Sequence, residues 1–175
     1  VERSRGLGDV YKRQPGGFGK RGTEGKIEAI RYAREKKIPF LGICFGMQMA
    51  MIEFARNILK IKKAGSSELD KNCFPVIGLI DEWNKDGKII KGTDKNLGGT
   101  MRLGLYEAKL RNNSAIKSIY KSNMIKERHR HRYEVNINLM QKFEKKGLIF
   151  SGVSPDNKLP EIIELKNHPW FIGCL

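Results

Sequence analysis

The hydrophobic and polar positions of this chain fall into blocks that predict short buried strands alternating with helices. Residues 23–37 carry apolar side chains at helical spacing and end in Lys and Arg, which favour a helix C-terminus. Pro39 interrupts this helix, and residues 38–44 form a short apolar run that is typical of a buried strand. Residues 46–59 show a second helical pattern that is apolar on most sides. This order of strand, turn and helix is typical of an α/β protein.

The same patterns extend to the end of the chain. Residues 60–74 are polar and predict a loop with a turn at Gly65-Ser66-Ser67, and the charged residues 84–96 predict a loop or a surface hairpin. The further predicted elements are strands at 75–81 and 98–110, a short helix at 114–122, an extended basic segment at 127–136, a helix at 137–147, and late strands in LIFSGVS, EIIEL and HPWFIGC.

Both ends of the chain depart from these patterns. Residues 1–14 show neither a helical nor a strand period, and their run GDVYKRQ resembles a translated adapter peptide. We therefore expect a non-native tail at 1–14 and a partial domain at 15–175. At the other end, HPWFIGCL stops inside an apolar run, which suggests truncation.

Composition narrows the class of protein. The 175 residues suit one domain, and no apolar run is long enough for a membrane span, so we expect no membrane partner. The 34 Lys and Arg exceed the 19 Asp and Glu, a formal charge of +15 that leaves a nucleic-acid or phosphate ligand open. Three widely spaced cysteines without a CxxC pair, and a start without an apolar signal segment, favour a reduced, cytoplasmic protein.

The motif Gly42-Ile43-Cys44-Phe45-Gly46 lies between the predicted strand and helix. Small residues on both sides of Cys44 suit the tight turn of a nucleophile elbow, which exposes the central side chain. The start of the next helix would favour the thiolate, the nucleophilic form of cysteine. The alternative is an ordinary buried cysteine in a glycine turn.

The glycine-rich segment PGGFG at 15–19 supports the nucleophile. Glycines let backbone N–H groups approach a ligand, so the N–H groups of Gly17 and Phe45 could form an oxyanion hole. The alternatives are a plain loop or a phosphate cradle, although the segment does not match a Walker pattern.

Taken together, PGGFG, GICFGMQ, GGTMRLG, ERHRHRYEVN, SGVSPD and EIIELKNHPWF resemble the glutamine amidotransferase domain of the CTP synthase family. The resemblance covers residues 15–174. GxCxGxQ alone indicates only the wider class I (triad) amidotransferases, whereas GGTMRLG and RHRHRYEVN are more particular. The resemblance implies a class I glutamine amidotransferase-like, flavodoxin-like α/β fold, with a mostly parallel central sheet flanked by helices and truncated at both ends.

The resemblance also implies roles for individual residues. Cys44 attacks the side-chain amide of L-glutamine, and the oxyanion hole is formed by Gly17 and Phe45. Residues 20–25 match the family's lid, which responds to the activator GTP. The implied glutamine-binding residues are Gly17, Phe45, Gly46, Met47, Gln48, Glu68 and Arg132, and the implied lid residues are Lys20, Arg21, Gly22, Thr23, Glu24 and Gly25. An arginine suits the substrate carboxylate and a glutamate its ammonium group.

The resemblance places further parts of the enzyme outside this chain. Ammonia would pass to a separate synthase domain, where ATP and Mg²⁺ support the amination of UTP to CTP, and the family is tetrameric. The family's catalytic His and Glu lie in a Phe-His-Pro-Glu segment after HPWFxxC and one Gln, whereas here Leu175 follows Cys174. We therefore expect the chain as given to be nearly inactive, and to need no cofactor of its own.

Two alternatives concern the basic segment. His129 and His131 share one face of a strand, which could hold a metal, although no third ligand is evident. The same segment could bind nucleic acid as a non-catalytic basic module, but its aromatic residues are few and no RNA- or DNA-binding motif appears. We expect neither a metal site nor a nucleic-acid partner.

Overall fold

The computed structural model describes residues 12–14, 16–17, 19–79 and 101–175. Residues 1–11 of the predicted tail and the predicted loop at 84–96 lie outside the described residues. The elements are, in chain order, β1 (Lys12–Gln14), α2 (Thr23–Glu35), β2 (Phe40–Ile43), α3 (Phe45–Asn57), β3 (Ala64–Ser66), β4 (Phe74–Leu79), β5 (Arg102–Leu110), α4 (Ala115–Tyr120), β6 (Met124–His131), β7 (Tyr133–Val135), the 3₁₀ helix η3 (Ile137–Leu139), α5 (Met140–Lys145), β8 (Leu148–Val153), β9 (Pro160–Leu165) and β10 (Phe171–Cys174).

The strands form two sheets. The larger has the order β1-β2-β10-β9-β8-β5-β6, and the smaller the order β3-β4-β7. Among the described strands of the larger sheet, the β1–β2 and β2–β10 pairings are parallel and the other four are antiparallel. The expectation of a mostly parallel sheet is therefore wrong. The links at 154–159 and 166–170 are too short for the crossover that parallel neighbours require.

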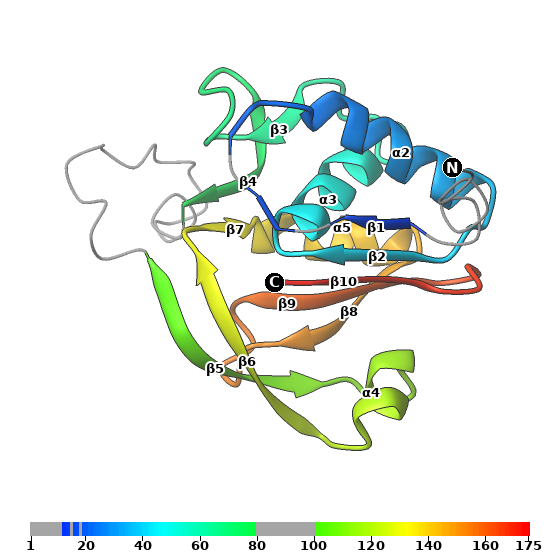
Figure 1. Ribbon diagram of the computed structural model, residues 1–175, viewed down its shortest axis with the longest axis vertical. Coiled ribbons are helices and arrows are strands. Elements are labelled where there is room, and N and C mark those ends of the chain that lie inside the picture. Colours follow the sequence, from blue (N-terminus) through cyan, green and yellow to red (C-terminus); the bar gives the residue numbers. More distant parts are fainter. Residues whose placement is uncertain (1–11, 15, 18, 80–100) are drawn as a thin grey trace, which may run out of the picture.

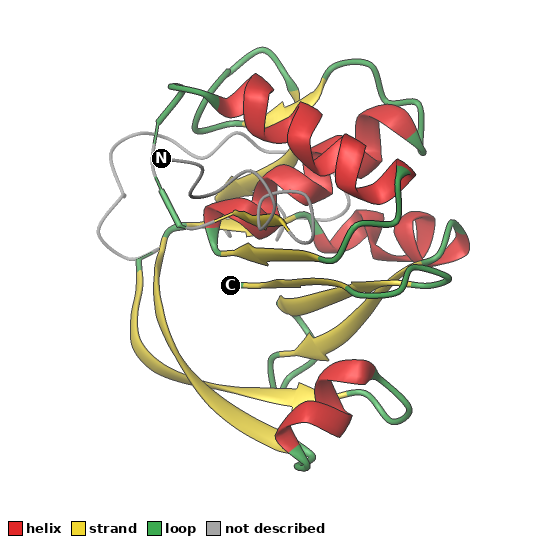
Figure 2. Cartoon of the chain, turned by 45° about the vertical axis from the view of Figure 1, so that its right-hand side comes forward, coloured by secondary structure: helices red, strands yellow, loops and turns green. Residues whose placement is uncertain are grey.

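Helices cover the larger sheet on both faces. Figure 1 shows α2 and α3 on one side of β1, β2 and β10, and α4 beside β5 and β6 at the far end of the sheet. Neighbouring residues of β9 and β10 alternate between two buried clusters, as the two faces of a strand require. Ile163 and Phe171 join the core with α2 and α3, whereas Ile162 and Ile172 join Ile116 of α4. Figure 2 shows that the two long strands β5 and β6 bend away from the rest of the sheet.

Two short strands were missed by the sequence patterns. Lys12–Gln14, assigned to the predicted tail, forms β1 at the edge of the larger sheet and pairs with β2. Residues Gly65 and Ser66, predicted as a turn, lie in β3 and pair with β4. Backbone hydrogen bonds hold both strands, so no side-chain period is needed.

The predicted extended segment 127–136 is broken in the structure. It divides at Arg132 into β6, which belongs to the larger sheet, and β7, which belongs to the smaller sheet. The other predicted helices and late strands are confirmed, with shifts of a few residues at their ends. Within the described residues, every helix is too short or too polar to cross a membrane.

Candidate active site

Cys44 lies at the turn between β2 and α3, with φ 50° and ψ −103°. A positive φ is strained in any residue except glycine, at a cost of about 1–3 kcal/mol. The turn is possible because Gly42 has no side chain: a Cβ there would lie 2.8 Å from the backbone carbon of Gly46. The strand, tight turn and helix predicted from the motif are therefore confirmed, and strain is retained at the candidate nucleophile.

The surroundings of Cys44 do not favour the thiolate overall. Burial raises the pKa of the Cys44 thiol above its ordinary value, and the charges of Glu134 and Glu68 raise it further. The Phe45 backbone N–H, at the start of α3, donates to the sulfur and lowers the pKa. The expected effect of the helix is present, but burial outweighs it. Cys44 therefore rests as a thiol, and nucleophilic attack requires a base.

A cavity of about 260 Å³ opens beside Cys44. It is lined by Gly17, Cys44, Gln48, Glu68, Met101, His131, Arg132 and Tyr133. These residues come from the 16–17 loop, the start of α3, the segment after β3, the start of β5 and the junction of β6 and β7. The cavity thus brings together five predicted site residues that are far apart in the sequence.

Glu68 and Gln48 connect parts of the cavity wall. Glu68 is half-buried; burial raises the pKa of its carboxyl, while the backbone N–H of Gly19 donates to it and lowers the pKa. Gln48 is 3% exposed, and its Nε2 donates to the carbonyl of Tyr133 at 2.9 Å. The glycine-rich loop is therefore held to Glu68, and α3 to the junction of β6 and β7.

Arg132 contributes positive charge to this cavity. It lies at the bend between β6 and β7, and its buried Nε has no hydrogen-bond partner among the described residues. A buried guanidinium donor without a partner costs free energy, which a bound carboxylate would recover.

The two residues predicted to form an oxyanion hole, Gly17 and Phe45, lie close together. A Cβ on Gly16 would be 3.8 Å from Cβ of Cys44, and one on Gly17 would be 3.7 Å from the Phe45 ring. The loop therefore packs against the Cys44 turn with glycines facing it. Phe45, Gly46 and Met47 are buried in the first turn of α3 and do not line the cavity.

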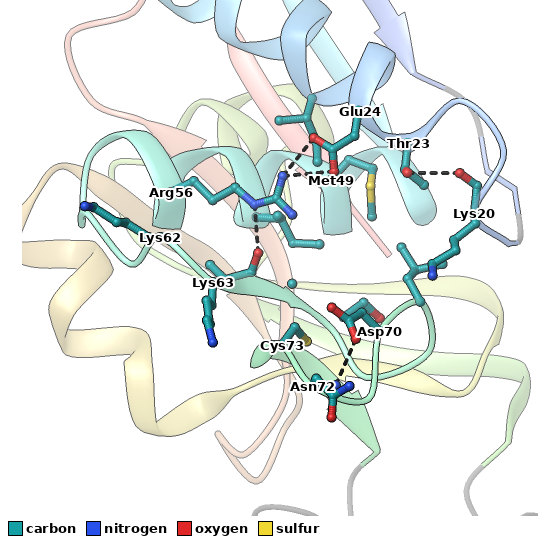
Figure 3. A pocket seen from close by; sticks show the side chains of 16 residues that line it. Lys20, Thr23, Glu24, Met49, Arg56, Lys62, Lys63, Asp70, Asn72 and Cys73 are labelled. Atoms are coloured by element: carbon teal, nitrogen blue, oxygen red, sulfur yellow. Dashed lines mark hydrogen bonds and ion pairs between the residues drawn. The ribbon is translucent and has the colours of Figure 1, made fainter.

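The predicted lid residues lie elsewhere. Lys20, Thr23 and Glu24 line a separate cavity of about 410 Å³ beside α3 and β3 (Figure 3). Glu24 accepts hydrogen bonds from Nη1 of Arg56 at 2.9 and 3.0 Å, and Thr23 Oγ1 donates to the Lys20 carbonyl at 3.0 Å. Gly22 precedes α2 with φ 73°, a conformation that suits glycine. The response of residues 20–25 to an activator stays a prediction.

A buried polar cluster extends from the cavity into the larger sheet. Glu134, which is 0% exposed, accepts hydrogen bonds from Nη1 of Arg102 at 3.1 Å and from Nε2 of His131 at 2.7 Å, both at Oε1. Arg102 Nη2 also lies 2.8 Å from Oε1 of Glu161. One guanidinium therefore faces two buried carboxylates.

His129 and Glu161, at the far end of this cluster from the cavity, have shifted pKa values. Burial, and then the charge of Arg102, lower the pKa of His129 to about 4. Burial raises the pKa of Glu161 to about 7, although Arg102 acts against it. In the described residues no group of three or more His, Cys, Asp or Glu is arranged to hold a metal ion. His129 and His131 instead lie beside Glu161 and Glu134.

Sequence reasoning missed two residues at this site. Glu134 was not singled out, and His131 was considered only as a metal ligand or as part of a polar strand whose residues form ion pairs. Their spacing of three residues spans the bend at Arg132, where neither a helical nor a strand period applies. A charged residue inside the apolar end of a predicted strand was the available signal for Glu134.

Comparison with known proteins agrees with this geometry. The glutamine amidotransferase class-I family model matches residues 15–174. The CTP synthase of Pelagibacter ubique is 77% identical over 159 residues, which are 91% of this chain and 30% of that protein. The CTP synthase of Zymomonas mobilis is 60% identical over 160 residues, 91% of this chain and 29% of that protein. The chain thus spans about 30% of the length of these curated relatives.

Solved structures agree as well. The glutaminase domain of Trypanosoma brucei CTPS with bound acivicin is 35% identical, with a TM-score of 0.80 over 93% of this chain and 60% of that chain. A Thermotoga maritima glutamine amidotransferase, with 13% identity and a TM-score of 0.56 over 99% of this chain and 57% of that chain, shares the fold alone. The predicted α/β amidotransferase fold and the resemblance drawn from the motifs are confirmed, with a curled mixed sheet in place of a mostly parallel one.

Proposed function

The chain belongs to the class-I glutamine amidotransferase family, and we propose that it is the glutamine-hydrolysing part of a CTP synthase, with Cys44 as its nucleophile. The observation that carries this proposal is the strained turn that presents Cys44 to a cavity lined by one acidic and one basic side chain, Glu68 and Arg132. The similarity to CTP synthases over 91% of the chain supports the choice of substrate.

The proposed chemistry begins at the sulfur of Cys44. The thiolate attacks the side-chain amide carbon of L-glutamine, and the oxyanion of the tetrahedral intermediate accepts hydrogen bonds from backbone N–H groups of Gly17 and Phe45. The C–N bond breaks, the nitrogen takes up a proton and ammonia leaves, so that a glutamyl thioester remains. Water then hydrolyses the thioester to glutamate and restores the thiol.

The charges of the cavity suit the amino-acid end of glutamine. We assign the substrate carboxylate to Arg132, whose Nε has no partner among the described residues, and the ammonium group to Glu68. Gln48, fixed on the carbonyl of Tyr133, completes this wall.

The activity of the longer protein is proposed from its relatives. Ammonia would reach a synthase domain that uses ATP and Mg²⁺ to aminate UTP to CTP, a ligase reaction of pyrimidine nucleotide biosynthesis in the cytoplasm. GTP would activate it through the lid residues 20–25, and the assembly would be a homotetramer. Since no group of described residues suits a metal ion, no step at Cys44 is assigned to Mg²⁺.

The test uses 6-diazo-5-oxo-L-norleucine, an electrophile shaped like glutamine. The thiol of Cys44 forms a sulfur–carbon bond at the diazomethyl carbon, which receives the thiol proton and loses N₂. We expect saturable labelling of Cys44, slowed by L-glutamine, with Cys73 and Cys174 unlabelled in peptide mass spectrometry. A Cys44→Ser variant is the control. Equal labelling of all three cysteines, or no protection by L-glutamine, would contradict the proposal.

Turnover of glutamine by this chain is a separate expectation. In the described part of the chain, the histidine at the cavity is His131, and its Nε2 is bonded to Glu134 rather than to Cys44. Without a base on the thiol, ammonia release should be reduced by a factor on the order of 10⁴ or more from that of an intact triad enzyme. Glutamate formation at an ordinary enzymatic rate by residues 1–175 would contradict this expectation.

A further inference from the structure

Arg132 and Tyr133 reach the cavity from a place where the chain leaves one sheet for the other. We call residues 131–134 the Arg132 bend. Its first residue, His131, pairs with Arg102 of β5 in the larger sheet, and Tyr133 pairs with Leu79 of β4 in the smaller sheet. The two ladders end on either side of Arg132, so backbone hydrogen bonds between strands do not by themselves set the angle of the bend.

A buried carboxylate joins the two sides of the bend. Oε1 of Glu134, on β7, accepts hydrogen bonds from His131 at the end of β6 and from Arg102 at the start of β5. All three side chains are almost completely removed from water, with exposed fractions of 0%, 3% and 6% in that order. Charged hydrogen bonds in such surroundings are strong and directional.

We infer that Glu134 is a positioning residue, which fixes the Arg132 bend and so places the Arg132 guanidinium for the amino-acid end of the substrate. The Tyr133 carbonyl, which holds Gln48, is placed by the same contacts. This inference rests on the proposed glutaminase function. His131 contributes to this positioning by donating a hydrogen bond to the Glu134 carboxylate from the end of β6.

Glu134 also affects Cys44, and this second effect lowers the reactivity of the thiol instead of supporting substrate binding. Its charge raises the pKa of the Cys44 thiol, so loss of that charge should make Cys44 more reactive toward an electrophile that does not use Arg132. The two effects can be separated with a glutamine-shaped probe and a small neutral probe. Loss of structure would instead raise the iodoacetamide rate at all three cysteines, so Cys73 and Cys174 serve as internal controls.

The experiment compares Glu134→Gln with the unaltered chain of 175 residues. Saturation labelling with 6-diazo-5-oxo-L-norleucine gives the inhibitor constant and the limiting rate, and iodoacetamide, whose iodide the thiolate displaces, gives intrinsic reactivity at each cysteine. Glu134→Gln should raise the inhibitor constant about tenfold or more through misplacement of the guanidinium. The iodoacetamide rate at Cys44 should rise, while the rates at Cys73 and Cys174 stay unchanged.

A second pair of variants tests the same contact from the other side. His131→Leu removes the donor to Glu134 and should raise the inhibitor constant in the same way. His131→Gln restores a donor near the position of Nε2 and should recover most of the binding. The matched control is Glu53→Gln: Glu53 is also 0% exposed and is bonded to Arg34 at 2.8 Å, but it lies in α3 away from the cavity. It should lower the melting temperature and leave the inhibitor constant unchanged.

Three outcomes would overturn the inference. The first is an unchanged inhibitor constant in a folded Glu134→Gln variant. The second is a rise in iodoacetamide reactivity at all three cysteines, which would mean that Glu134 only maintains the fold. The third is an equal effect of Glu53→Gln on the inhibitor constant. Failure of the unaltered chain to show glutamine-protected labelling would instead overturn the proposed function, and this inference with it.

Discussion

The Cys44 turn (residues 42–48) and the Arg132 bend face the same cavity, but they are held by different means. The turn is set by its own backbone and by the absence of a side chain at Gly42, where a Cβ would approach Gly46 to 2.8 Å. The bend is set by hydrogen bonds among three separate strands, with Arg102 and His131 both bonded to Glu134. Sterics within seven residues define the first, and long-range electrostatics define the second.

The two regions show two different means by which the residues of a site are held in place. The glycine turn costs backbone strain at Cys44, and the sheet holds it in place, since the Cys44 N–H donates to the carbonyl of Cys174 at 2.6 Å. The buried charges need every partner, because a carboxylate without its cation is strongly destabilising in the interior. A side chain added at Gly42 should therefore disrupt the turn, and removal of one charged partner should disrupt the bend.

The largest effect is expected from Arg102→Met. This change leaves Glu134 and Glu161 without their shared cation, and the free energy of unfolding should fall by about 3–5 kcal/mol. Urea unfolding at pH 7.5 measures the loss. The matched control is Arg111→Met, which removes the exposed ion pair of Arg111 with Glu144 and should cost less than about 1 kcal/mol. Equal losses in the two variants would show that burial of the cluster does not matter.

The next effect concerns the Cys44 turn. Gly42→Ala places a methyl group against the backbone of Gly46, and we expect a loss of about 2–3 kcal/mol together with slower labelling of Cys44. The matched control is Gly25→Ala in α2, where a Cβ meets nothing within 4 Å. There the better helix former should stabilise the protein by about 0.5–1 kcal/mol. A Gly42→Ala variant as stable as the unaltered chain would mean that the turn can rearrange.

The smallest net effect is the pH dependence of stability in the unaltered chain, because two groups of the cluster shift stability in opposite directions. Glu161 has a pKa of about 7 when folded and 4.5 as its ordinary value, so between these values the folded state alone holds the proton. Its contribution is complete below about pH 4.5 and is lost as the pH rises to 7. His129 behaves oppositely: its pKa of about 4 when folded, against 6.5 ordinarily, makes stability increase from about pH 4 to 6.5.

The two groups therefore offset each other between about pH 4.5 and 6.5. His129→Gln should reveal a stability that falls with rising pH, and Glu161→Gln one that rises, each by up to about 1.4 kcal/mol per pH unit. Urea unfolding at several pH values between 4.5 and 7 measures both slopes relative to the unaltered chain. Parallel curves for the three proteins would contradict the assignment of these shifts to His129 and Glu161.

The sequence predicted those parts of the molecule that depend on neighbouring residues. The helix of 46–59 and the strand of 38–44 were found from their apolar patterns, and the turn at Cys44 from Gly42 and Gly46. It missed β1 at Lys12–Gln14 because these three residues show no hydrophobic period, whereas the strand is defined by its backbone pairing with β2. It also missed Glu134, because the role of Glu134 depends on a hydrogen bond from Arg102, which lies 32 positions away in the sequence.

Local residue types were enough to determine the helices, most strands and the tight turn at Cys44, since sterics and hydrophobic period act within a few residues. Only the folded chain decided the mixed order of the larger sheet and the break of 127–136 at Arg132. It also decided that Arg102, His131, Glu134 and Glu161 meet beside the Cys44 cavity. The physical reason is that a buried charge takes its partner from whichever strand is adjacent in space, and that strand is chosen by the packing of the whole sheet.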